Sequence, residues 1–283
     1  MDFNKIATLA FLLAISSLQS LYAQETIYEK EDSIFIENII RKLSNRDSAT
    51  EGCKITSIAK EFYGKEYVAG TLDRYSNEPL FISSKEVDCT TFVELVLSLY
   101  LTPENGCFDD VCRNLERIRY RNGERNGYIS RLHYISWWID DNSKQKIVNE
   151  IYTLWHTAEQ SSELYFMSRH PESYPQLKEA PELIKEISAY EKIYNNKTRR
   201  YIPKEKIAEL SNEDIRNGDI IAIVTNIKGL DVAHIGFAYW QKNELHLIHA
   251  SSSRKKVLCD PLPLSQYLAN NSRHIGIRIF RTL

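Results

Sequence analysis

A cysteine at the predicted start of an apolar helix is the residue of this chain best placed to do chemistry. Cys89 follows Asp88, a residue type that caps helices well, and precedes the apolar residues Phe92 and Val93. The unpaired N–H groups and the positive dipole end of a helix start favour thiolate over thiol, so we expect a lowered pKa and a nucleophilic sulfur. Free cysteines are more often buried and inert, and Cys89 taken alone would favour that interpretation.

A histidine far downstream supplies the base that a cysteine nucleophile requires. Segment 232–239 is typical of a strand, and its alternation places His234, Gly236 and Ala238 on one face. The two small neighbours leave room for a helix. We expect the Cys89 helix to pack there, because a general base must lie within hydrogen-bonding reach of the thiol. The alternative is a half-buried structural histidine.

Two further histidines on the next predicted strand could orient that base. His246 and His249 are three residues apart, so a strand directs them to opposite faces. A shared metal site is therefore not expected, and at most one of the two can contact His234. The residues alone do not choose between them. The other four histidines are predicted to be structural or surface residues: His133, His156, His170 and His274.

The elements that must position these residues are predicted from periodicity. Apolar residues at helical spacing indicate helices at 34–43 and 53–62, before the Cys89 helix, and again at 108–118, 147–154 and 183–190. Period-two patterns indicate strands at 220–225, 232–240, 244–250 and 274–279, with turn residues between them. Runs of helices followed by runs of strands predict an α+β fold with an antiparallel sheet.

The amino terminus has the pattern of a secretory signal peptide. Lys5 precedes an apolar run at 6–15, and Leu21-Tyr22-Ala23 forms a small-residue cleavage site before Gln24. The run has about ten residues against the roughly twenty that span a bilayer, and no cysteine follows for a lipid anchor. We therefore expect residues 1–23 to be removed and residues 24–283 to form one exported, soluble domain without a membrane span, periplasmic or extracellular.

Composition limits the partners of that domain. The hydrophobic content of 43% fits a globular protein, and a formal charge of −2 gives no long-range attraction for nucleic acid. Five cysteines leave one unpaired after any pairing, and Cys89 is our choice for the free thiol. Cys107 and Cys112 could form a disulfide or stay free, and the pairing of Cys53 and Cys259 is open as well.

Five short motifs in a fixed order resemble the NlpC-like papain-fold peptidases of bacterial cell walls. They are the tyrosine-containing loop 64–70, the Asp-Cys-Thr-Thr-Phe-Val helix start at 88–93, the Asn-Gly-Asp turn at 217–219, the Ala-His-Ile-Gly-Phe strand at 233–237 and the Ile-His-Ala-Ser-Ser strand at 248–252. Each motif is weak alone, whereas the ordered set is specific. Asn217 stands where this family has proline, which affects a turn and not the chemistry.

The resemblance implies a papain-like fold and a set of catalytic residues. It assigns the nucleophile to Cys89, the base to His234, the orienting residue to His249 and a site tyrosine to Tyr67. No metal and no cofactor are implied. The implied substrate is peptidoglycan or a muropeptide released from it.

A long segment between the cysteine and the histidine resembles one branch of this superfamily. The segment at about 105–205 is predicted to be a mainly helical insertion, and its motif at 130–134 with Trp137-Trp138 is similar to the N-acetylmuramoyl-L-alanine amidase-like branch. Ser130, Arg131 and Tyr134 are the implied substrate-binding residues. Arg131, Tyr134 and Trp138 also share one predicted helical face, which suits a glycopeptide as well as it suits a solvated surface.

Three functions remain open at this point. The branch implies cleavage of the amide between the lactyl group of muramic acid and L-alanine. A γ-D-glutamyl-diamino acid endopeptidase would use the same catalytic residues, and only the binding pocket would differ. An inactive peptidoglycan-binding protein is the alternative of another class, and the intact set of Cys89, His234 and His249 argues against it.

Overall fold

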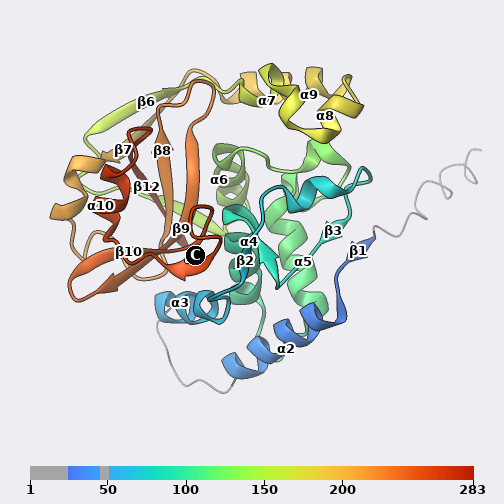
Figure 1. The fold of residues 1–283 in the computed structure, drawn as a ribbon, viewed down its shortest axis with the longest axis horizontal. Helices are drawn as coiled ribbons and strands as arrows, with labels where there is room; N and C mark the ends of the chain where they lie inside the picture. The colour runs from blue at the N-terminus through green and yellow to red at the C-terminus, as the bar shows by residue number, and fades with distance from the viewer. Residues whose placement is uncertain (1–24, 45–50) are drawn as a thin grey trace, which may run out of the picture.

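The computed structural model describes residues 25–44 and 51–283 (Figure 1). The predicted signal peptide at 1–23 therefore lies outside the described residues. Within the described ranges, no helix has both the length and the apolar character needed to cross a membrane.

Helix α4 (Cys89–Leu101) lies at the centre of the molecule, between α5 (Phe108–Arg119) and the strands (Figure 1). Every residue of α4 from Thr91 to Leu99 is buried, which is typical of a helix that is apolar on all sides. Phe92 contacts Phe62 on one side and Phe237 on the other, with ring centroids 5.8 Å apart in both pairs. These contacts fix α4 between the helical layer and the sheet.

The remaining helices of the first third pack around α4. They are α2 (Lys30–Ser44) and α3 (Glu51–Glu61), and they confirm the helices predicted from periodicity. The short strands β1 (Thr26–Ile27) and β3 (Leu80–Phe81) pair in parallel beside them.

The sheet has the order β4-β2-β11-β10-β9-β8-β12-β7-β6, and β5 also pairs with β12. Its strands are β2 (Glu66–Tyr67), β4 (Glu86–Val87), β5 (Val148–Ile151), β6 (Ala158–Ser162), β7 (Lys197–Pro203), β8 (Ile220–Thr225), β9 (Val232–Gln241), β10 (Glu244–Ser251), β11 (Lys256–Cys259) and β12 (His274–Thr282). All pairs are antiparallel except β2 with β4. The α+β prediction and its four predicted strands, now β8, β9, β10 and β12, are confirmed.

The two faces of β9 pack against different layers. Ile235 and Phe237 belong to the core that contains α4, whereas Ala238 belongs to a second core with α10 (Leu264–Ala269) and η5 (Lys204–Glu209). His234 and Gly236 share the face of Ala238. The prediction that the Cys89 helix packs on this small-residue face is therefore wrong, because α4 covers the opposite face.

The segment between α4 and β8 contains more strands than its periodicity predicted. It holds α5, α6 (Ile135–Lys144), α7 (Phe166–Arg169), α8 (Pro175–Glu179) and α9 (Leu183–Tyr194), together with β5, β6 and β7. The helix predicted at 147–154 is wrong, because Val148–Ile151 pairs with β12 instead. Apolar residues four apart fit a helix, but the free edge of a long strand offers this segment a stronger partner.

A buried ion pair joins α4 to α5. Arg119 Nε lies 2.7 Å from Glu94 Oε2, and both side chains are only 3% exposed. Arg119 also donates to the Phe81 carbonyl at 2.8 Å. Burial raises the pKa of Glu94 even with this partner beside it, so the carboxylate depends on Arg119 to stay ionised.

We predict that Arg119→Met lowers the free energy of unfolding by about 3–5 kcal/mol, because it leaves the Glu94 carboxylate buried without a partner. Urea denaturation followed by circular dichroism measures the change. The matched control is Lys42→Met, whose ammonium pairs with Glu61 at 2.6 Å on the surface. The control should change stability by less than about 1 kcal/mol. Equal effects of the two substitutions would show that the buried pair does not hold α4 in place.

Candidate active site

Cys89 occupies the first position of α4, as predicted. The Asp88 side chain accepts hydrogen bonds from the main-chain N–H groups of Thr90 at 3.0 Å and Thr91 at 2.8 Å. The Thr91 hydroxyl in turn accepts the Asp88 N–H at 2.8 Å, which completes a capping box. The helix start is thus fixed by its own residues, and Cys89 keeps partial exposure to solvent.

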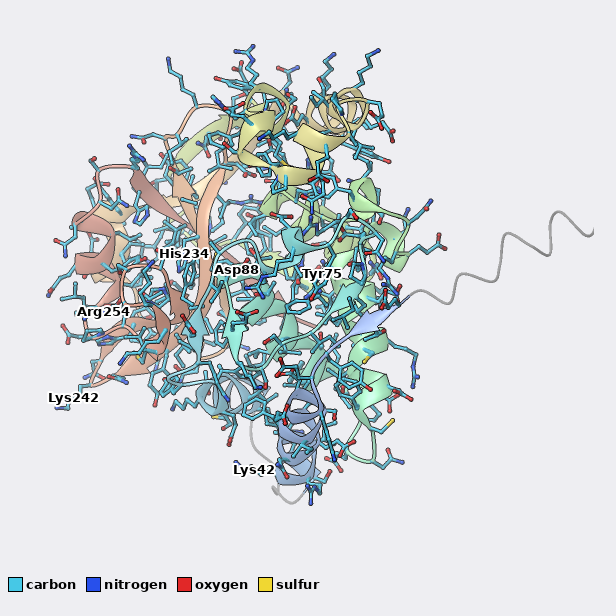
Figure 2. The ribbon with its side chains drawn as sticks, turned by 45° about the vertical axis from the view of Figure 1, so that its right-hand side comes forward. Lys42, Tyr75, Asp88, His234, Lys242 and Arg254 are labelled. Atoms are coloured by element: carbon cyan, nitrogen blue, oxygen red, sulfur yellow. The ribbon has the colours of Figure 1, made fainter. Side chains whose placement is uncertain are left out.

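The thiol of Cys89 lies against strand β9. The main chain of Ile235 forms a hydrogen bond with the thiol, and Ile235 follows His234 directly. In Figure 2 the labelled side chains of Asp88 and His234 lie where the start of α4 meets β9.

The surroundings of Cys89 and His234 disfavour the charged form of each group. Burial, followed by the charge of Asp88, raises the pKa of the Cys89 thiol to about 12, and the hydrogen bond from Ile235 only partly offsets this. Burial and the neighbouring His249 and His274 hold the pKa of His234 well below its usual value. The expectation of a lowered thiol pKa is therefore wrong, because desolvation and the capping carboxylate outweigh the helix dipole. Both shifts therefore favour the neutral thiol and the neutral imidazole.

His234 is hydrogen-bonded to His249, which in turn contacts a carboxylate. His234 Nε2 lies 2.6 Å from His249 Nδ1, and the two rings are nearly perpendicular. His249 Nε2 lies 3.3 Å from Asp260 Oδ2. His249 is fully buried and Asp260 is 3% exposed. The contact between His234 and His249 was predicted, whereas Asp260 was not, because only the pairing of β10 with β11 brings it beside His249.

Gly236 makes this histidine pair possible. A Cβ atom at Gly236 would lie 2.7 Å from the Ile248 carbonyl oxygen and 2.9 Å from the His249 Cβ. Distances this short do not occur between such atoms, so any larger residue would displace His249. The small residue beside His234 thus leaves room for a second histidine and not for a helix.

His246 serves a different purpose from His249. It is buried, and its Nδ1 lies 2.8 Å from the main-chain oxygen of Asp260, to which it donates. The two histidines point to opposite sides of β10, as strand alternation predicted. His246 therefore fixes the main chain of Asp260, while His249 contacts its side chain.

Three aromatic and histidine side chains surround the catalytic candidates. Burial, then the charges of Cys89 and Asp88, raises the pKa of Tyr67 to about 12. Its role as the site tyrosine stays a prediction. Tyr267 on α10 contacts the His249 ring edge-on at 5.4 Å and stacks on His274 at 5.8 Å. His274 was predicted to be structural, yet it lies close enough to His234 to lower its pKa. Tyr267 carried no sequence signal of this position. His274 begins a second His-Ile-Gly triplet, which was predicted to lie in a terminal strand without a catalytic role because no polar strand follows it.

The implied substrate-binding residues are held by protein contacts. Arg131 is buried and pairs with Asp73 at 2.6 Å and with Glu78 at 3.3 Å. The Tyr134 hydroxyl is also buried and donates to Glu191 at 2.7 Å. The Ser130 hydroxyl donates to the Gly127 carbonyl at 2.7 Å.

These residues do not share a helical face. Helix α6 begins at Ile135, and Arg131 is extended and bridged to Tyr120. The predicted helical face is therefore wrong for Arg131 and Tyr134, which precede α6, and burial of Arg131, Tyr134 and Trp138 also excludes the solvated face. Within the described residues, no hydrogen bond or ion pair joins Arg131 to Cys89 or His234. Their role in binding substrate stays a prediction.

Neither a disulfide nor a metal site is present among the described residues. All five cysteines are free, so the alternative of a disulfide between Cys107 and Cys112 is wrong. Across residues 25–44 and 51–283, no three side chains of the types that bind metals gather into a site.

Solved structures resemble this chain over most of its length. An N-acetylmuramoyl-L-alanine amidase from Bacteroides uniformis is 39% identical, with a TM-score of 0.79, and the match covers 83% of this chain and 99% of the amidase. A Bacteroides fragilis protein named as a xylanase candidate is 43% identical, with a TM-score of 0.76 and coverage of 80% and 99%. A Legionella pneumophila protein of the DUF1460 family is 26% identical, with a TM-score of 0.66 and coverage of 89% and 97%.

The comparison with family models agrees with the structural matches. No curated protein matches the chain significantly. The family model described as AmiA-like, N-acetylmuramoyl-L-alanine amidase-like, matches residues 57–277 and so includes Cys89, His234 and His249. This chain therefore belongs to the N-acetylmuramoyl-L-alanine amidase-like family.

Proposed function

We propose that this protein is a cysteine-dependent N-acetylmuramoyl-L-alanine amidase that cleaves the amide between the lactyl group of muramic acid and L-alanine. The observation that carries the proposal is a thiol at a capped helix start that is hydrogen-bonded to the main chain of Ile235, the residue directly after a histidine that a second histidine holds at 2.6 Å. Membership of the amidase-like family and the match to the Bacteroides uniformis amidase support the substrate class. The papain-like fold is part of the same proposal.

The mechanism follows from the neutral resting pair. His234 takes the Cys89 proton as the sulfur attacks the amide carbonyl, because neither group is ionised beforehand. The Cys89 main-chain N–H and the Tyr67 hydroxyl would stabilise the oxyanion. The His234 imidazolium then protonates the leaving amine of L-alanine, and the lactyl group remains on sulfur as a thioester. A water molecule deprotonated by His234 hydrolyses the thioester and restores the thiol.

Glycoside hydrolysis, suggested by the name of the Bacteroides fragilis protein, fits this site less well. That reaction ordinarily needs two carboxyl groups on either side of the scissile bond. The two carboxylates beside Cys89 and His249 are both occupied: Asp88 caps α4, and Asp260 contacts His249 and the Leu262 N–H. The arrangement therefore favours acyl transfer through a thiol.

Export is part of the proposal. The predicted signal peptide at 1–23 and the cell-wall substrate of the proposed reaction both support a location outside the cytoplasm. We infer that the domain acts in the periplasm or outside the cell, on peptidoglycan or on muropeptides released from it.

We predict that the protein converts a muramoyl-tripeptide into free muramic acid sugar and an intact peptide that begins with L-alanine, detected by mass spectrometry. Cys89→Ala should reduce this conversion to background while the circular dichroism spectrum stays unchanged. Cys53→Ala is the control, because Cys53 is an exposed free thiol on α3. Cleavage after γ-D-glutamate would instead identify an endopeptidase, and activity of Cys89→Ala near wild type would exclude the cysteine mechanism.

The neutral pair predicts an unusual pH dependence. The active form requires uncharged His234, and its lowered pKa means that kcat/KM should fall only as the pH drops below the ordinary histidine value of about 6.5. The raised pKa of Cys89 means that thiolate absorbance should be absent at neutral pH in a difference spectrum against Cys89→Ala. A thiolate signal at neutral pH would show that the pair rests as an ion pair.

A further inference from the structure

The carboxylate of Asp260 is fixed at both oxygens and through its main chain. Oδ1 accepts the N–H of Leu262 at 3.0 Å, and Oδ2 lies 3.3 Å from His249 Nε2. The main-chain oxygen accepts from His246 Nδ1 at 2.8 Å. Asp260 is 3% exposed, and the nearest cation is the half-exposed Arg254, 3.9 Å from Oδ2. Asp260 therefore has little freedom to rotate away from His249.

An ionised carboxylate sets the direction of the hydrogen bonds beyond it. Burial opposes ionisation of Asp260, but the hydrogen bonds from His249 and Leu262 hold the pKa of this carboxyl below its usual value. A carboxylate can only accept, so His249 must carry its proton on Nε2. His249 Nδ1 is then an acceptor, and His234 must donate to it through Nε2–H. The lone pair of His234 is left on Nδ1.

We propose that Asp260 is a positioning residue that fixes the tautomers of His249 and His234, so that His234 Nδ1 is free to take the proton of Cys89. The inference rests on the proposed function for the role of that proton transfer. The tautomers themselves follow from the contacts of Asp260 and can be measured without substrate. Asp260 would thus be a fourth residue of the proposed catalytic set, after Cys89, His234 and His249.

The substitution Asp260→Asn should reverse the direction of the hydrogen bonds that link residue 260, His249 and His234. Only the amide oxygen can accept the Leu262 N–H, so the amide nitrogen takes the place of Oδ2 and donates to His249 Nε2. His249 then carries its proton on Nδ1 and donates to His234 Nε2. His234 in turn carries its proton on Nδ1, where it cannot accept one from Cys89. The change removes a charge but almost no volume.

The experiment is nuclear magnetic resonance of the protein labelled with ¹⁵N-histidine, which distinguishes protonated from unprotonated ring nitrogens. In the wild type, His234 and His249 should both be protonated on Nε2. In Asp260→Asn both should be protonated on Nδ1, and muropeptide turnover should fall by roughly a thousandfold or more through kcat. Asp141→Asn is the control, because the Asp141 side chain is also buried and accepts from the main-chain N–H of Asn122, outside the site. It should leave both tautomers unchanged.

Two results would overturn the inference. One is Nδ1–H on either histidine of the wild type, which needs no variant and so does not depend on how Asp260→Asn folds. The other is unchanged tautomers in a folded Asp260→Asn protein. If the tautomers switch as expected but the wild type does not cleave muropeptides, the positioning role stands and the proposed amidase function fails. The two proposals are thereby tested separately.

Discussion

The contact between the start of α4 and strand β9 is the constraint on which the rest of the molecule depends. The capping box of Asp88 and Thr91 fixes where the helix begins. The contact of Phe92 with Phe237 and the buried pair of Glu94 with Arg119 then fix the helix against the sheet and against α5. An error of one helical residue would rotate the thiol by about 100° and remove it from His234. These contacts of α4 with the cap, the sheet and α5 thus determine the position of the Cys89 sulfur.

The same contact explains the electrostatics of the site. Close packing desolvates Cys89 and His234, and the carboxylate that caps the helix adds a negative charge where the helix dipole alone would be positive. Both shifts disfavour charge on the thiol and on the imidazole. In the proposed mechanism the proton would therefore stay on sulfur until a substrate binds, and the orientation of His234 by His249 and Asp260 would matter more than a preformed thiolate.

Features that depend on neighbouring residues were predictable from the sequence, whereas contacts between distant segments were not. The start of α4 was found because its cap consists of neighbouring residues, and β9 and β10 were found because alternation is local. Alternation shows which residues share a face but not which layer covers it, so α4 was placed on the wrong side of β9. Segment 148–151 became a strand because β12 pairs with it. Predicting the position of Asp260 would have required the register of β10 with β11, in which Ile248 pairs with Cys259.

The central claim is that Cys89 carries the acyl group of a muramoyl substrate, and the mass of the trapped intermediate tests it most directly. Wild-type protein is mixed with a muramoyl-peptide, quenched in acid within the first turnover, digested and analysed by mass spectrometry. We expect a thioester on the peptide that contains Cys89, with the added mass of the muramic acid sugar and its lactyl group. An adduct with the mass of the L-alanyl-γ-D-glutamyl unit, or an adduct on another residue, would contradict it.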